Sequence, residues 1–229
     1  MGATGGPGSP IPAWLAWSSG KDSAFALHEV RRSGAFEVVR LLTVITDPFD
    51  RVSMHGVREE LLDAQARALG LPLVKVRIPY PCPNETYERA MAEALQGAAA
   101  DRVRTVVFGD LFLEDVRAYR EARLSPLGFR AIFPLWGRPT GPLAREMVSS
   151  GIEARICCLD PRRLSRSFAG RPFDSELLGQ LPPEVDPCGE RGEFHTFVSR
   201  APGFRAAVEV RLGSTVERDG FVFADLELA

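Results

Sequence analysis

The amino-acid sequence predicts an α/β fold in which a parallel sheet with covering helices is followed by a smaller α/β domain. Three observations support this fold class. Apolar runs rich in β-branched residues, such as residues 38–45, are typical of strands that are covered on both faces. Segments with helical spacing of apolar residues alternate with these runs up to about residue 125. Beyond that point proline and glycine become frequent, and apolar and polar residues alternate instead.

The elements of the first region alternate between strand and helix. The predicted strands are residues 13–17, 38–45, 73–78 and 105–108, and the predicted helices follow the loop at 18–23, begin near 57 and cover 84–99. The first two helices end at Gly34 and Gly70, because glycine adopts the left-handed conformation that closes a helix. Such units form a parallel sheet with right-handed crossovers, and ligands bind beyond the carboxyl ends of its strands. Ser18, Asp47 and Asp110 fall at these ends.

The second region is predicted to mix both kinds of element. In order, it has a strand at 131–133, a helix at 142–150, a strand at 154–159 and antiparallel strands at 204–212 and 221–228, around Gly213-Ser214 and Asp219-Gly220. We therefore expect a flexible tail at residues 1–11, a first domain at 12–125 and a smaller domain at 126–229.

Charge and hydropathy limit the partners. The formal net charge of -2 gives no basic field, which argues against nucleic acid and anionic membranes as partners. No apolar stretch approaches the roughly 20 residues that span a bilayer, and residues 1–10 lack the charged-then-hydrophobic pattern of a secretory signal. We therefore expect a cytoplasmic protein, and leave a homodimer open.

The cysteines do not indicate a metal or redox site. Cys82, Cys157, Cys158 and Cys188 contain no C-x-x-C pair. Cys157 and Cys158 lie in a strand-like run whose alternation points their side chains to opposite faces. We interpret all of them as reduced packing residues, although Cys188 could also serve as a nucleophile.

The loop Ser18-Ser19-Gly20-Lys21-Asp22-Ser23 has the features of a phosphate site. Backbone N–H groups of a Gly/Ser turn that opens a helix form an anion-binding concavity. Ser19 and Gly20 allow close backbone approach, and the hydroxyls of Ser18 and Ser23 can donate. Lys21 and Lys75 are the only lysines in an arginine-rich chain, so a compact ammonium is favoured for neutralising phosphate. The alternative is a simple N-capped helix.

This hexamer resembles the S-G-G-x-D-S loop of the PP-loop ATP pyrophosphatases. In this chain, Ser19 stands where that family usually has a glycine. The resemblance implies a Rossmann-like, doubly wound parallel sheet of five strands that binds ATP. It also implies that ATP is cleaved between its α and β phosphates.

Three further segments resemble the diphthine-ammonia ligase group of this superfamily. They are residues 109–112 with Arg117, residues 134–136 and, above all, residues 186–197. The resemblance covers nearly all of the chain after residue 12. It implies that residues 12–125 bind ATP and that residues 126–229 carry the acceptor site. The implied reaction activates a carboxylate with ATP, replaces the adenylate by ammonia or an amine, and releases AMP and pyrophosphate.

The group's motif G-E-x-G-E-[FY]-x-T carries over to Glu190, Gly192, Glu193, Phe194 and Thr196. Two carboxylates three residues apart on a glycine-rich loop could bind ammonium or a cationic acceptor and accept its proton. The alternative is a solvated loop paired with arginines.

The remaining candidates lie around the strand ends. Gly109 and Asp110 are expected at the nucleotide, and His55 either contacts ribose or phosphate or caps a helix. Mg²⁺ is expected with ATP, held by Asp22 and Asp110. The predicted catalytic residues are therefore Lys21, Asp110, Glu190 and Glu193.

Two other functions stay open at this point. One is a regulatory module of the same fold that binds ATP or AMP without turnover. The other is a tRNA-modifying PP-loop enzyme, which predicts a basic groove and a sulfur-carrying cysteine pair; the net charge and the cysteine spacing do not favour it.

Overall fold

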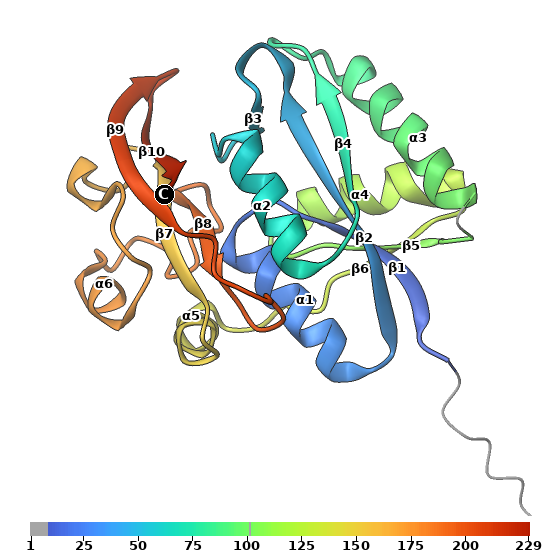
Figure 1. The fold of residues 1–229 in the computed structure, drawn as a ribbon, viewed down its shortest axis with the longest axis horizontal. Coiled ribbons are helices and arrows are strands. Elements are labelled where there is room, and N and C mark those ends of the chain that lie inside the picture. The colour runs from blue at the N-terminus through green and yellow to red at the C-terminus, as the bar shows by residue number, and fades with distance from the viewer. Residues whose placement is uncertain (1–8, 101) are drawn as a thin grey trace, which may run out of the picture.

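A computed structural model describes residues 9–100 and 102–229 of the chain (Figure 1). Most of the tail expected at 1–11 lies outside the described residues, which begin at residue 9. Ile11, the last residue of that expected tail, already belongs to the first strand, β1 (Ile11–Ala16).

Five parallel strands form the first sheet, in the order β4, β2, β1, β5 and β6. Besides β1 they are β2 (Phe36–Thr46), β4 (Leu73–Ile78), β5 (Thr105–Val107) and β6 (Arg130–Ile132). This confirms the predicted doubly wound parallel sheet. A short antiparallel strand, β3 (Arg51–Val52), pairs with the end of β2 and was not predicted, because two residues carry too little pattern.

Helices cover both faces of this sheet (Figure 1). They are α1 (Lys21–Ser33), α2 (Glu59–Leu69), α3 (Asn84–Ala100) and α4 (Glu114–Leu124), with a 3₁₀ turn at Asp47–Phe49. Neighbouring residues of β1 point to opposite faces, so Leu15 is buried in the core that includes α1 and α2, whereas Trp14 is buried with α3 and α4. Gly34 and Gly70 close the first two helices in the left-handed conformation, as predicted.

The first sheet continues past the expected domain boundary near residue 125. After the 3₁₀ turn Ser125–Leu127, β6 pairs in parallel with β5. The division at 125 stays a prediction, and any boundary that keeps the first sheet whole lies after Ile132.

A second, antiparallel sheet of four strands follows, in the order β8, β7, β10 and β9. The strands are β7 (Glu153–Leu159), β8 (Phe194–Arg200), β9 (Val210–Arg218) and β10 (Phe221–Leu228), accompanied by α5 (Thr140–Ser149), α6 (Ser175–Gln180) and a 3₁₀ turn at Arg166–Phe168. With these helices it forms the smaller α/β part that the sequence predicts.

Two details of the second sheet differ from expectation. The strand predicted at 204–212 instead covers Val210–Arg218, so Gly213 lies inside β9 and the hairpin turns at Asp219-Gly220 alone. Strand β8 was not predicted, because the glycines around Glu190 and Glu193, just before it, indicated a loop.

The second sheet packs against the face that carries α1 and α2 (Figure 1). Phe197 and Val198 of β8 belong to the same buried cluster as Leu27 and Leu61. Residues of the two sheets therefore share one apolar core, which fixes β8 beside the loop at 18–23.

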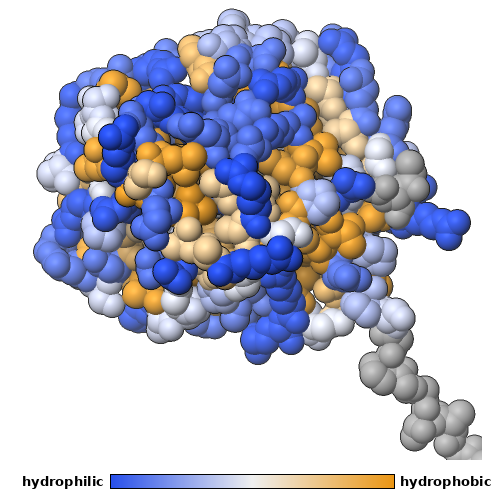
Figure 2. Space-filling view, viewed as in Figure 1, coloured by the Kyte–Doolittle hydropathy of each residue, from blue (hydrophilic) through white to orange (hydrophobic). Residues whose placement is uncertain are grey.

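In the view of Figure 2, hydrophilic residues border apolar patches across the middle of the face. None of the helices that the structure describes is long and apolar enough to cross a bilayer.

Candidate functional site

A cavity of about 430 Å³ lies at the carboxyl ends of the parallel strands. Its walls come from the loop at 18–23, the ends of β2 and β5, the turn after β3, the first turns of α3 and the segment before β8. The chemically relevant wall residues are Ser18, Asp22, Ser23, Ser53, Met54, His55, Tyr87, Met91, Gly109, Asp110, Arg120, Gly189, Glu190 and His195. The structure thus brings together most of the predicted site residues, from both parts of the chain.

The loop presents its hydroxyls to this cavity. Ser18 and Ser23 line it, their hydroxyl oxygens lie 3.3 Å apart, and Ser23 Oγ donates to Gly20 O at 2.9 Å. Ser19 adopts a φ of 69°, in the left-handed region that favours glycine. Its side chain is fully buried, and its hydroxyl has no hydrogen-bond partner among the described residues. Ser19 therefore contributes its backbone rather than its side chain.

Two glycines are required by close packing around the loop. A Cβ at Gly109 would lie 2.8 Å from the carbonyl carbon of Asp22 and 3.0 Å from the amide nitrogen of Ser23. A Cβ at Gly20 would lie 2.9 Å from His55 Cε1 and 3.0 Å from Thr196 O. Backbone atoms cannot yield as a flexible side chain does, so both positions need glycine.

Strand β8 braces the loop from the second part of the chain. The amide of Val198 donates to Ser19 O at 2.9 Å, and the amide of Lys21 donates to Thr196 Oγ1 at 3.1 Å. Gln65 of α2 is fully buried and donates both to Ser19 O at 3.0 Å and to Val198 O at 2.7 Å. Gln65 was not predicted, although a polar residue on the otherwise apolar face of α2 was the available signal.

Lys21 lies elsewhere than expected. Its side chain is 1% exposed, its Nζ donates to Asp22 Oδ2 at 2.9 Å and to the carbonyl of Cys188, and it lies 5.4 Å from the ring centroids of Phe173 and Phe194. Burial lowers the pKa of Lys21, but the Asp22 carboxylate and other nearby groups outweigh it, so the pKa is raised and the ammonium stays charged. The ammonium does not line the cavity, so its predicted direct contact with phosphate is not what the geometry favours; it holds the loop to the second part of the chain.

Of Glu190 and Glu193, which the motif suggested as a pair, only Glu190 lines the cavity. Glu190 lines the cavity, and its Oε1 accepts from the amide of Leu111 at 2.7 Å. Glu193 is buried away from the cavity and accepts from the amides of Asp186 at 3.1 Å and Arg191 at 3.0 Å. Glu193 therefore fixes the shape of the segment, and Glu190 alone faces the cavity.

The environment of Glu190 favours proton exchange near neutral pH. Burial raises its pKa to about 7, the carboxylates of Asp22 and Asp110 add to this, and the Leu111 amide and Lys21 oppose it. A base whose pKa lies near the working pH is well suited to general acid–base catalysis.

Asp22 and Asp110 each face a cation. Asp110 accepts from Nε and Nη2 of Arg120 at 2.8 and 3.0 Å, and Asp22 pairs with Lys21. Within the described residues, no three His, Cys, Asp or Glu side chains converge so as to hold a metal ion by themselves. Mg²⁺ is usually bound by one or two carboxylates together with substrate phosphates and water, and the two aspartates fit that mode.

Two histidines, His55 and His195, line the cavity, and His55 lies beside Gly20 of the loop. The rings of His55 and His195 have centroids 4.5 Å apart, and His55 Nδ1 lies 3.2 Å from Thr196 O. Burial lowers the pKa of His195 to about 4 and that of His55 well below its usual value, so both are neutral at pH 7. The N-cap of α2 is Arg58, so His55 does not cap this helix. His195 is a cavity residue that was not predicted from the sequence.

Three of the four cysteines are buried, as the packing interpretation predicts, and Cys82 is partly exposed. Cys157, Cys158 and Cys188 are buried and free, and burial raises the pKa of Cys188 to about 12. A thiol with that pKa is not the nucleophilic thiolate that sulfur transfer needs.

Comparison with known proteins adds to this geometry. A family model described as the diphthamide synthase N-terminal domain matches residues 13–130, and another described as the diphthamide synthase C-terminal domain matches residues 140–224.

Curated relatives include three named diphthine–ammonia ligase. The protein from Schizosaccharomyces pombe is 26% identical over 219 residues, which are 87% of this chain and 36% of that protein. The proteins from Rattus norvegicus and Danio rerio are each 26% identical, over 90% of this chain and 85% and 89% of their own lengths. The chain thus spans about a third of the yeast relative and most of the vertebrate ones.

Proposed function

The chain belongs to the diphthamide synthase family, and from that premise we propose that it is an ATP-dependent ligase that forms an amide from a carboxylate and ammonia or an amine. The observation that carries the proposal is the single cavity in which a phosphate-type loop from one part of the chain meets Glu190 from the other.

ATP occupies this cavity with its pyrophosphate end at the loop. The N-terminus of α1 and the hydroxyls of Ser18 and Ser23 face that end and favour negative charge. The adenine lies beside the end of β2 and residues Val52 to Met54, which form the apolar wall of the cavity. Asp22 and Asp110 would hold Mg²⁺, which when bound with ATP offsets phosphate charge.

The reaction proceeds in two displacements. A carboxylate oxygen of the acceptor attacks the α phosphorus of ATP, the bond from that phosphorus to the bridging oxygen breaks, and pyrophosphate leaves at the loop. The nitrogen of ammonia then attacks the acyl carbon, the bond to the phosphate oxygen breaks, and AMP leaves.

Glu190 takes the proton that the attacking nitrogen loses in the second displacement. It is the cavity carboxylate with a pKa near 7, whereas Asp22 and Asp110 are engaged by Lys21 and Arg120. General-base assistance of this kind is worth about 10²–10⁴-fold in rate.

The proposal is tested by incubating the protein with ATP, ¹⁵N-ammonium and a metabolite extract, and by measuring AMP, pyrophosphate and ¹⁵N-labelled amides by mass spectrometry. We expect AMP and a labelled amide in equal amounts. Glu190→Gln should bind ATP but form little amide, whereas Glu184→Gln, which changes an exposed carboxylate outside the cavity, should match the wild type. ATP binding without AMP formation under every acceptor condition would contradict the proposal and favour a regulatory module.

A further inference from the structure

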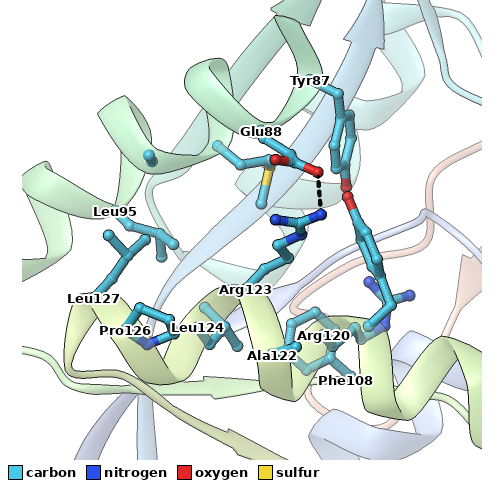
Figure 3. A pocket seen from close by; sticks show the side chains of 13 residues that line it. Tyr87, Glu88, Leu95, Phe108, Arg120, Ala122, Arg123, Leu124, Pro126 and Leu127 are labelled. Carbon is cyan, nitrogen blue, oxygen red and sulfur yellow. Dashed lines mark ion pairs between the residues drawn. The ribbon is translucent and has the colours of Figure 1, made fainter. Parts of the chain in front are cut away.

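A second cavity of about 250 Å³ lies between α3 and α4 (Figure 3). Its walls are mostly apolar: Met91, Ala92 and Leu95 come from α3, Ala122 and Leu124 from α4, and Pro126 and Leu127 from the turn that follows. Tyr119 and Leu127 are 38% and 45% exposed, and belong to the few large hydrophobic residues that the described part of the chain leaves open to water. Apolar surface that is exposed to water is unfavourable, and such an opening is therefore a typical binding site for an apolar ligand.

The second cavity adjoins the proposed nucleotide cavity. Tyr87, Met91, Phe108 and Arg120 line both. Phe108 directly follows β5, and it precedes Gly109 and Asp110 on the nucleotide side. The two cavities are therefore neighbours that share these side chains as a common wall.

A cationic group stands at the junction. Arg120 lies over the ring of Phe108, with its guanidinium carbon 4.4 Å from the centroid, and its Nε and Nη2 donate to Asp110. Its Nη1 donates to no acceptor among the described residues, so one edge of the guanidinium is free for a further carboxylate. Between Arg120 and the apolar end formed by Leu95 and Leu127, an ion pair of 2.7 Å between Arg123 and Glu88 joins α4 to α3 (Figure 3).

We propose that this second cavity binds the apolar body of a small carboxylic acid, whose carboxylate reaches Arg120 and the nucleotide as the acceptor of the ligase. The inference rests on the proposed function for the role of acceptor, but not for binding. The volume of about 250 Å³ is below the ~300–1,000 Å³ of sites for drug-sized ligands, so it fits the apolar body of a small acid.

Affinity should follow the length of the apolar body. Each methylene that leaves water should raise the affinity about fourfold until the cavity is full. The carboxylate should matter as well, so that a primary alcohol of the same length binds at least tenfold more weakly than the acid, since a charged hydrogen bond to Arg120 is lost.

The test measures binding by calorimetry to the full chain loaded with α,β-methylene-ATP, so that no turnover is needed. The ligands are butanoate, hexanoate, octanoate and 1-octanol. Ala92→Phe fills the cavity from α3 and should weaken octanoate at least tenfold, with the affinity for the ATP analogue unchanged. Ala118→Phe, at an exposed position of α4 outside the cavity, is the matched control and should bind octanoate as the wild type does.

The outcomes separate the two proposals. An affinity that does not depend on chain length, or an Ala92→Phe variant that binds octanoate like the wild type, would overturn the assignment of the cavity. Should Ala92→Phe fail to fold, Leu127→Trp fills the same cavity from its exposed rim and serves as the second variant. If octanoate binds as expected but no AMP forms from ATP with any acid, the proposed function fails while the binding site stands.

Discussion

Replacing Glu190 by Gln isolates the effect of a single carboxylate in the cavity. The substitution keeps the shape of the side chain and keeps an oxygen that accepts from the Leu111 amide. It removes only the ability to ionise. The folded protein raises the pKa of Glu190 from its ordinary 4.5 to about 7, chiefly through burial. Ionisation of Glu190 is therefore less favourable in the folded wild type than in the unfolded chain, and this difference lowers the stability of the wild type at pH values above 4.5.

The sign and size of this cost follow from linkage. Below pH 4.5 the carboxyl is protonated in both the folded and unfolded states and contributes nothing. Between pH 4.5 and about 7 the unfolded chain releases the proton while the folded chain keeps it, so the free energy of unfolding falls as the pH rises. A shift from 4.5 to about 7 corresponds to about 3 kcal/mol at alkaline pH. Glu190→Gln has no ionisable group at this position and so does not lose stability in this way. The free energy of unfolding of the variant minus that of the wild type should therefore increase by about 2 to 3 kcal/mol between roughly pH 5 and pH 8.

The measurement is urea unfolding of both proteins at several pH values, without nucleotide, followed by tryptophan fluorescence. Glu184→Gln controls for the loss of one exposed negative charge. Amide formation is measured over the same pH range. At a constant concentration of free NH₃, the wild-type rate should rise about tenfold per pH unit below about 7 and then level off, and Glu190→Gln should be slower by about 10²–10⁴-fold without that rise. A stability difference that stays constant between pH 5 and 8 would refute the raised pKa and, with it, the choice of Glu190 as the base.

Three further substitutions test the loop. Lys21→Met should lower the free energy of unfolding by roughly 3 kcal/mol, because it leaves Asp22 without its cation. It should change the affinity for ATP only a few-fold, because the ammonium does not line the cavity. A loss of ATP affinity beyond a hundredfold with unchanged stability would instead support the phosphate contact predicted from the sequence. Gly109→Ala should weaken ATP binding more than tenfold, since its Cβ would press on loop backbone at 2.8 Å, whereas Gly179→Ala, with open space around the added atom, should bind ATP normally. Thr196→Val should cost about 1–3 kcal/mol of stability, measured by urea unfolding, because the buried Lys21 amide loses its acceptor, and Thr196→Ser should retain most of it; equal losses in both would exclude the hydrogen bond as the cause.

The parallel sheet was predictable because each strand carries its own signal. Residues 38–45 are apolar on both faces, and Gly34 and Gly70 end the helices on either side. The two-residue β3 has no such pattern, and β8 follows a glycine-rich segment that resembles a loop in sequence. Strand β3 is defined by its pairing with β2, and β8 by its pairing with β7. Pairing between strands is not visible in the local sequence of either one.

The sequence indicated many of the residues that line the cavity, but not the directions of their side chains. The spacing of Ser18 to Ser23 and the motif around Glu190 identified residues that the fold brings to one cavity. Lys21 stands at the first position of α1, where its side chain could have faced the phosphates or the neighbouring domain. That choice depends on the rings of Phe173 and Phe194 and on the carbonyl of Cys188, which are remote in sequence and surround the buried ammonium.

Ser19 shows how the two parts of the chain depend on each other. A non-glycine residue held in the left-handed region costs on the order of 1–3 kcal/mol, which a glycine at this position would avoid. Its carbonyl oxygen accepts from both the Val198 amide and the Gln65 side chain, and each such bond contributes about 1 kcal/mol. The strain and the two hydrogen bonds are thus of similar size, so the loop keeps its shape only while β8 and α2 hold it. Because Glu190 lies just before β8, the strand that holds the loop at 18–23 also positions the proposed base beside it. We infer that the two parts of this chain form one catalytic unit, since neither completes the cavity alone.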